Sequence, residues 1–138
     1  RMLANSGHSV EVWSALPGEI DELVSTHRQI NLPNMEIPSS VKFTKSIEKV
    51  CTQKDILLFA IPSICVRSVA KQAQPYILDG QIIVDVAKGI EADTLLTLTN
   101  VIREEVCADG KHANIKLVAL SGPTHAEEVA KDIPSTIV

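Results

Sequence analysis

The sequence has neither an excess of positive charge nor a long apolar run, and each absence excludes a class of protein. Its 13 Lys and Arg residues against 17 Asp and Glu residues give a formal net charge of −4, which leaves no basic surface for nucleic acid. The longest apolar run, residues 56–61, is far shorter than the ~20 residues that span a bilayer. We therefore expect no nucleic-acid partner and no membrane insertion. An anionic small molecule would have to be held by local groups.

Cysteine and histidine are also scarce. The three cysteines, Cys51, Cys65 and Cys107, lie far apart and include no Cys-x-x-Cys pair, which argues against a disulfide framework or a zinc ribbon. The four histidines show no metal-ligand spacing such as His-Glu-x-x-His. We therefore expect reduced thiols in a cytoplasmic protein, and no metal site.

Both ends of the sequence have the pattern of a domain that continues beyond them. Residues 1–7 resemble the last turns of a helix, with Gly7 just after its end. Residues 133–138 stop inside an apolar stretch, and the chain has neither an initial Met nor a signal-peptide pattern. The expectation is a partial domain.

Strands and helices are expected to alternate along the chain, with aliphatic residues forming the core because aromatic residues make up only 3%. Strands are predicted at residues 9–13, 41–44, 55–61, 81–86 and 116–120, and helices at residues 17–29, 46–50, 64–73, 91–106 and 126–131. A Pro-rich connection covers residues 33–38. The runs 55–61 and 81–86 are apolar on both faces, as in buried parallel strands. The alternation predicts an α/β fold with a Rossmann-like, doubly wound, mainly parallel sheet.

Three segments follow the ends of predicted strands, where ligands of such sheets bind. They are residues 62–63, 87–91 and 121–126. Lys88 follows a buried strand and precedes Gly89, so it is either a point charge for a phosphate or polarised oxygen, or a solvated loop lysine. The chemistry of the domain is expected within these segments.

The third segment, Ser-Gly-Pro-Thr at residues 121–124, precedes a predicted helix. Thr124 could cap that helix, and Glu127 would complete a capping box. The amides of such a helix start suit an anion, although a purely structural cap has the same sequence. Both interpretations stay open on these residues alone.

The residues after the first predicted strand face the adenosine ribose in a dinucleotide-binding fold. An acid is expected there for a 2′-hydroxyl, or a base for a 2′-phosphate. Ser14 and Ala15 stand at these positions and supply neither charge.

Several segments together resemble the amino-terminal domain of bacterial-type NAD(P)-dependent glycerol-3-phosphate dehydrogenases. The resemblance covers the whole chain and is carried by residues 5–13, 61–63, 88–91, 120–130 and 134–136. The most specific are Lys-Gly-Ile-Glu at residues 88–91 and Ser-Gly-Pro-Thr-His-Ala-Glu-Glu at residues 121–128. A Gly-x-Gly-x-x-Gly motif is absent from the chain.

The resemblance implies hydride transfer between NAD or NADP and the pair dihydroxyacetone phosphate and glycerol 3-phosphate. It also implies that the glycerol 3-phosphate formed is used for glycerophospholipid synthesis. In the family, the lysine matching Lys88 contacts both substrate and cofactor and would stabilise charge on the carbonyl oxygen. The positions matching Gly122 and Thr124 contact the substrate. Those matching Ala126 and Pro62 lie against the cofactor.

The sequence departs from the family pattern in two places and lacks two of its parts. Ala15 stands where many members have Arg or His, and His125 replaces a common Phe. The first strand with its Gly-rich loop would precede residue 1. The helical substrate domain, with the general acid/base lysine, would follow residue 138. Residues 1–138 are thus expected to be a partial dinucleotide-binding domain, and the complete enzyme a possible homodimer.

Two alternatives remain. One is another Rossmann-type dehydrogenase, of the 3-hydroxyacid, 6-phosphogluconate or ketopantoate type, against which residues 121–128 argue. The other is a non-catalytic nucleotide-sensing module, which would lack the helical domain and its lysine.

Overall fold

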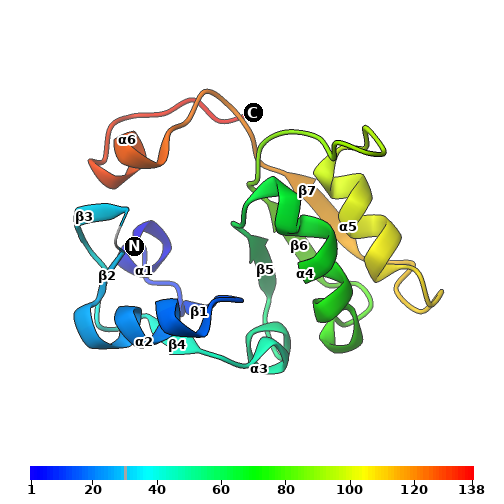
Figure 1. Cartoon of the computed structure of the whole chain (residues 1–138), viewed down its shortest axis with the longest axis horizontal. Coiled ribbons are helices and arrows are strands. Elements are labelled where there is room, and N and C mark those ends of the chain that lie inside the picture. The colour runs from blue at the N-terminus through cyan, green and yellow to red at the C-terminus, as the bar shows by residue number, and fades with distance from the viewer. Residues whose placement is uncertain (30) are drawn as a thin grey trace. The chain divides into compact units, whose positions relative to one another are not determined.

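The computed structural model describes residues 1–29 and 31–138 (Figure 1). The chain divides into two compact units. The first unit comprises Arg1–Val50 and Thr124–Ser135, and the second comprises Cys51–Pro123 and Thr136–Val138. The chain therefore leaves the first unit after Val50 and returns to it at Thr124.

The first unit begins with the short helix α1 (Met2–Asn5) and a parallel strand pair. Gly7, at φ +89°, follows α1, and the Gly7 amide donates to the carbonyl of Ala4. This geometry confirms Gly7 as the residue that ends the helix. Strand β1 (Glu11–Trp13) then pairs in parallel with β4 (Lys42–Thr44).

Helix α2 (Pro17–Thr26) is shorter than predicted. It ends because His27 adopts the left-handed conformation at φ 51°. Strand β2 (Arg28–Gln29) follows and pairs antiparallel with β3 (Leu32–Glu36). The prediction that the helix continues to residue 29 is therefore wrong, and the Pro-rich connection contains a strand that was not predicted. The unit is completed by α6 (Ala126–Ala130), which contacts β3.

The second unit contains a three-stranded parallel sheet covered by two helices on one face (Figure 1). Its strands, in the order β5 (Ile56–Phe59), β6 (Ile82–Asp85) and β7 (Lys116–Ala119), confirm the predicted parallel sheet. The covering helices are α4 (Val66–Ala73) and α5 (Leu98–Val106). The η1 turn (Ser63–Cys65) connects β5 to α4, and η2 (Gln74–Tyr76) follows α4. The short helix α3 (Ile47–Cys51) leads from β4 of the first unit to β5.

The core of the second unit lies between one face of this sheet and the two helices. Leu57 and Ile83 point into it from neighbouring positions of β5 and β6. Apolar residues at helical spacing meet them from α4 and α5: Val66, Val69, Ala70, Leu98, Val101, Ile102 and Val106, all buried. These residues fix the strand ends that carry the candidate site.

The opposite face of this sheet carries exposed aliphatic side chains. Ile56 and Leu58 of β5 are 55% and 47% exposed, and Val118 of β7 is 46% exposed. The sequence predicted strand β5 to be buried on both faces, whereas the structure buries only the face carrying Leu57 and Phe59.

Helix α5 begins at Leu98, later than the predicted residue 91. Residues 90–97 instead form a closed loop, because Ile90 and Thr97 pair in an antiparallel bridge. Leu95 takes φ +58° there, and the Glu91 amide donates to the Leu96 carbonyl at 2.9 Å. These contacts use backbone groups that a longer helix would have bonded internally.

In the part of the chain that the structure describes, no helix has the length and apolar character needed to cross a membrane.

Candidate functional site

The parallel strands of the second unit bring three loops to one edge of the sheet. The segment after β5 contains Pro62 and Ser63, the segment after β6 contains Lys88 and Gly89, and the segment after β7 contains Gly122. Because the strands are parallel and in register, their carboxyl ends meet at this edge, where α/β sheets bind ligands. All five residues lie in the segments predicted to hold the chemistry, and the family resemblance implies a role for three of them: Pro62, Lys88 and Gly122.

Lys88 and Gly122 are in direct contact. The Lys88 ammonium donates a hydrogen bond to the Gly122 carbonyl oxygen at 2.9 Å, across 34 residues of sequence. Lys88 is exposed, and an ammonium has three N–H donors. The structure thus brings together two residues for which the family resemblance implies contact with the substrate.

Gly122 is required by its surroundings. Its φ of +135° is one that residues with a side chain rarely adopt. A Cβ at this position would come within 2.4 Å of the Thr136 carbonyl oxygen. The neighbouring Ser121 and Val138 exchange two backbone hydrogen bonds, at 3.0 and 2.8 Å. The backbone that presents the Gly122 carbonyl to Lys88 is therefore tightly held.

The segments after β5 and β6 also approach each other. Gly89 has φ +115°, and a Cβ built there would lie 4.0 Å from Cβ of Ser63. Pro62 is exposed and precedes the η1 turn, whose Cys65 amide donates to the Pro62 carbonyl at 2.9 Å. Little side-chain bulk therefore separates these two loops.

Thr124 and Ala126, the other two predicted site residues, belong to the first unit. Thr124 is half-buried and Ala126 is exposed at the start of α6. The capping box predicted for Thr124 and Glu127 is wrong. The N-cap residue is His125, in an extended conformation at φ −119°, and it makes no side-chain capping bond. The helix therefore starts one residue later than a Thr124 cap requires.

Two charged features near the edge have partners that the sequence does not reveal. Asp85, the last residue of β6, is only 4% exposed, and its Oδ1 accepts a hydrogen bond from the Ala87 amide at 3.0 Å. Burial raises the pKa of the Asp85 carboxyl above its usual range. Arg67 of α4 forms ion pairs with Glu91, in the same loop as Lys88. Its distance in sequence from Glu91 gave no local signal for this pair.

The second unit also contains three free thiols and a hollow between its two helices. Cys51, Cys65 and Cys107 are free, and burial raises the pKa of the Cys51 thiol to about 11. Among residues 1–29 and 31–138, no group of three or more His, Cys, Asp and Glu residues could hold a metal ion.

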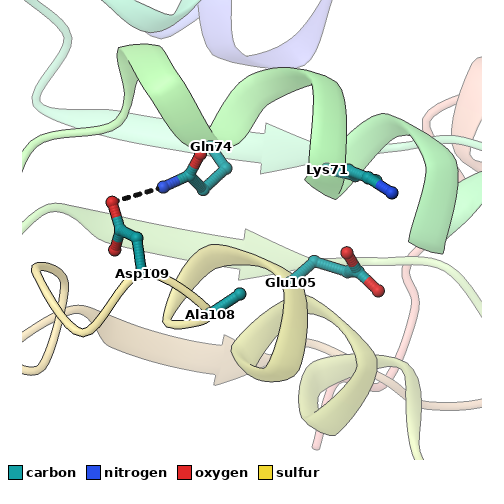
Figure 2. A pocket seen from close by; sticks show the side chains of 5 residues that line it. All are labelled: Lys71, Gln74, Glu105, Ala108 and Asp109. Atoms are coloured by element: carbon teal, nitrogen blue, oxygen red, sulfur yellow. Dashed lines mark hydrogen bonds between the residues drawn. The ribbon is translucent and has the colours of Figure 1, made fainter.

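The hollow, of about 240 Å³, lies between α4 and α5 and is shown in Figure 2. It is lined by Lys71, Gln74, Glu105, Ala108 and Asp109. Gln74 and Asp109, whose side chains are 2.6 Å apart, follow the last turns of these helices. Both helices start beyond strand carboxyl ends and run back, so the hollow lies toward the end of the unit opposite Lys88.

The parallel strands, the helices between them and the lysine at the carboxyl edge define a Rossmann-like α/β domain. Within that class, the family described as NAD-dependent glycerol-3-phosphate dehydrogenase N-terminus matches residues 1–138. The chain belongs to this family, which confirms the resemblance found in the sequence.

Named relatives and a solved structure agree with the family. The chain is 68% identical over 138 residues to glycerol-3-phosphate dehydrogenase [NAD(P)+] 2 of Lactobacillus delbrueckii subsp. bulgaricus, covering 100% of this chain and 41% of the relative. It is 45% identical over 139 residues to glycerol-3-phosphate dehydrogenase [NAD(P)+] of Agathobacter rectalis, covering 99% and 39%. The crystal structure of glycerol-3-phosphate dehydrogenase from Coxiella burnetii superposes with a TM-score of 0.85 at 25% identity, covering 98% and 40%. The chain thus spans about two fifths of the length of these proteins.

Proposed function

We propose that the protein containing this chain transfers a hydride between NAD(P)H and dihydroxyacetone phosphate, giving glycerol 3-phosphate. The observation that carries the proposal is the hydrogen bond between Lys88 and the Gly122 carbonyl at the carboxyl edge of the sheet. It places a cation beside rigid backbone where ligands of this fold bind. Family membership supports the same reaction.

The residues at this edge fit such a substrate and cofactor. An ammonium suits a phosphate-bearing substrate and the oxygen of its carbonyl group. Gly89, where a Cβ would meet no atom nearer than 4.0 Å, leaves room for a flat ring against the backbone. Bound NAD(P)H would supply the hydride.

In this proposal Lys88 stabilises negative charge as it develops on the substrate oxygen. Gly122 and Thr124 contact the substrate, while Lys88, Pro62 and Ala126 contact the cofactor. The general acid/base lysine belongs to a helical domain beyond residue 138. Residues 1–138 are one part of the dinucleotide-binding domain.

The proposal also covers where the complete protein acts, what its product is used for and how it assembles. The complete protein would act in the cytoplasm, supply glycerol 3-phosphate for glycerophospholipid synthesis, and form a homodimer. A non-catalytic nucleotide-sensing module is the competing function. It would bind dinucleotide but show no turnover with dihydroxyacetone phosphate.

Replacing Lys88 in the complete enzyme tests the proposal. We expect Lys88→Ala to lower kcat/KM for dihydroxyacetone phosphate at least about a hundredfold, because removing a single donor to a developing oxyanion has an effect of this size. The matched control is Lys111→Ala, an exposed lysine in the connection before β7, which should leave the kinetics within about twofold. Near-normal kinetics for Lys88→Ala would refute the role of Lys88.

A further inference from the structure

We propose that Arg67 is a positioning residue for the reaction, because its paired hydrogen bonds to Glu91 fasten the loop that carries Lys88. The inference rests on the proposed function of Lys88. Arg67 itself lies on α4, the helix that follows β5, whereas Lys88 and Glu91 lie in the loop that follows β6.

The contact between Arg67 and Glu91 uses both oxygens of the carboxylate. Arg67 Nε donates to Glu91 Oε1 at 2.7 Å, and Nη2 donates to Oε2 at 2.6 Å. This two-bond arrangement fixes the direction of the carboxylate as well as its distance, which a single ammonium cannot do. Glu91 is only 20% exposed, so the pair is partly shielded from water.

The remaining guanidinium donors tie the same arginine to α5. Nη1 donates to Glu105 at 2.6 Å, and Nη2 also reaches Glu104 at 3.0 Å. Arg67 therefore joins the helices on the sheet to the loop between β6 and α5. The hydrogen bonds from Arg67 lower the pKa of the Glu91 carboxyl to about 2. The same bonds raise the pKa of the Arg67 guanidinium, so both groups are ionised at neutral pH.

Glu91 also closes the loop. Its amide donates to the Leu96 carbonyl, its carbonyl accepts from the Leu95 amide, both at 2.9 Å, and its Oε2 accepts from the Thr94 hydroxyl at 2.6 Å. A carboxylate held by Arg67 on one side and by its own loop on the other gives residues 90–97 a fixed place against α4.

Lys88 is separated from this anchor by Gly89 and Ile90. Gly89 is the most permissive residue for backbone rotation, and a Cβ there would only just touch Ser63, at 4.0 Å. Gly89 thus does little to fix the backbone of Lys88. Because misplacement by about 1 Å can lower a rate a hundredfold, an anchor at Glu91 has a direct kinetic consequence for Lys88.

The test uses the complete enzyme with Arg67→Met, Arg67→Lys and the matched control Arg103→Met, an exposed arginine on α5. We expect Arg67→Met to lower kcat/KM by about tenfold to a hundredfold. Arg67→Lys should recover part of the loss, because it keeps the charge but not the paired geometry. Arg103→Met should stay within about twofold. Hydrogen exchange should speed up at the amides of residues 89–97 in Arg67→Met and remain unchanged in β5–β7.

A double-mutant cycle with Lys88→Met separates positioning from a general structural effect. If Arg67 acts through Lys88, adding Arg67→Met to Lys88→Met should cost at most a further twofold. Fully additive losses, or near-normal kinetics of Arg67→Met alone, would overturn the positioning role while Lys88→Met stays impaired. If Lys88→Met alone were near normal, the proposed function itself would fail, and the positioning role with it. Should Arg67→Met not fold, Glu91→Gln releases the same anchor and takes its place in the cycle.

Discussion

A carboxylate lies beside the end of strand β1, at the position where a dinucleotide-binding fold places the adenosine ribose. Ser14 Oγ donates to Glu19 Oε2 at 2.5 Å, and Gln29 Nε2 donates to Glu19 Oε1 at 3.1 Å. The sequence pattern points only to Ser14 and Ala15 at this position. The first turn of α2 brings Glu19 back to Ser14, which adds a negative charge near a site that has Ala15 in place of a base.

We therefore predict that the complete enzyme discriminates only modestly against NADH. The ratio of kcat/KM with NADPH to that with NADH should stay below about a hundredfold, or ~2.7 kcal/mol. Glu19→Gln should strengthen NADPH binding more than NADH binding, because a carboxylate repels a 2′-phosphate. Calorimetric titration of both cofactors measures this, with Glu22→Gln, an exposed acid on the same helix, as control. A larger NADPH preference in the unmodified enzyme would show that another group supplies a positive charge.

Strand β6 ends in a charged side chain that is almost fully buried. Asp85 is 4% exposed and accepts a hydrogen bond from the Ala87 amide. Burial without a full set of partners raises its pKa, so its ionised form destabilises the fold. The hydrogen bond to Ala87 can be made equally well by an amide oxygen.

We predict that Asp85→Asn raises the free energy of unfolding of the complete protein by about 1 kcal/mol at neutral pH. The carboxyl pKa is higher in the folded than in the unfolded chain, so the penalty is complete above the folded value. It declines as the pH falls through that value toward the unfolded one, about 4. The advantage of Asn should shrink in the same range. Thermal unfolding across pH 4–8 measures it, and a destabilised variant at neutral pH would contradict the argument.

The elements differ in how well local sequence predicts them. Strands β5, β6 and β7 were predicted because their apolar runs are bounded by polar and turn residues, and α4 because its apolar residues recur at helical spacing. The start of α5 was missed because the Ile90–Thr97 bridge competes with helical hydrogen bonds. The partners of Glu91 and Glu19 were missed for a related reason. These contacts depend on packing between elements that are distant in the sequence. Lys88 and Gly122 could be placed from the sequence because each lies just after a predicted strand.

In the second unit, the described strand at one edge of the sheet has a single neighbour, and one face of the sheet exposes aliphatic side chains. Among the described strands, β5 is hydrogen-bonded only to β6. Ile56, Leu58 and Val118 expose about half of their surface on the face opposite α4 and α5. Unpaired backbone groups next to exposed apolar side chains favour pairing between molecules.

We predict that a polypeptide of these 138 residues self-associates and does not bind dinucleotide measurably. Sedimentation and calorimetric titration with NADH test this. Leu58→Lys should reduce association, because it places a charge on this exposed face, whereas Leu57→Lys should unfold the chain, because Leu57 is buried. A monomer with a cooperative thermal transition and micromolar NADH affinity would refute the prediction.

The return of the chain at Thr124 has a consequence for synthesis on the ribosome. The first 50 residues of the first unit emerge early, yet α6 and the partner of Arg1, Asp132, whose Oδ1 lies 2.5 Å from Arg1 Nη2, come from beyond residue 123. At the usual elongation rate of about 5–20 residues per second, the unit waits roughly 4–15 s for its last segment. During that time β5, β6 and β7 are all translated. The first unit is therefore begun before the strands of the second unit are made, and it receives α6 only after them. The last segment of the second unit, Thr136–Val138, follows later still.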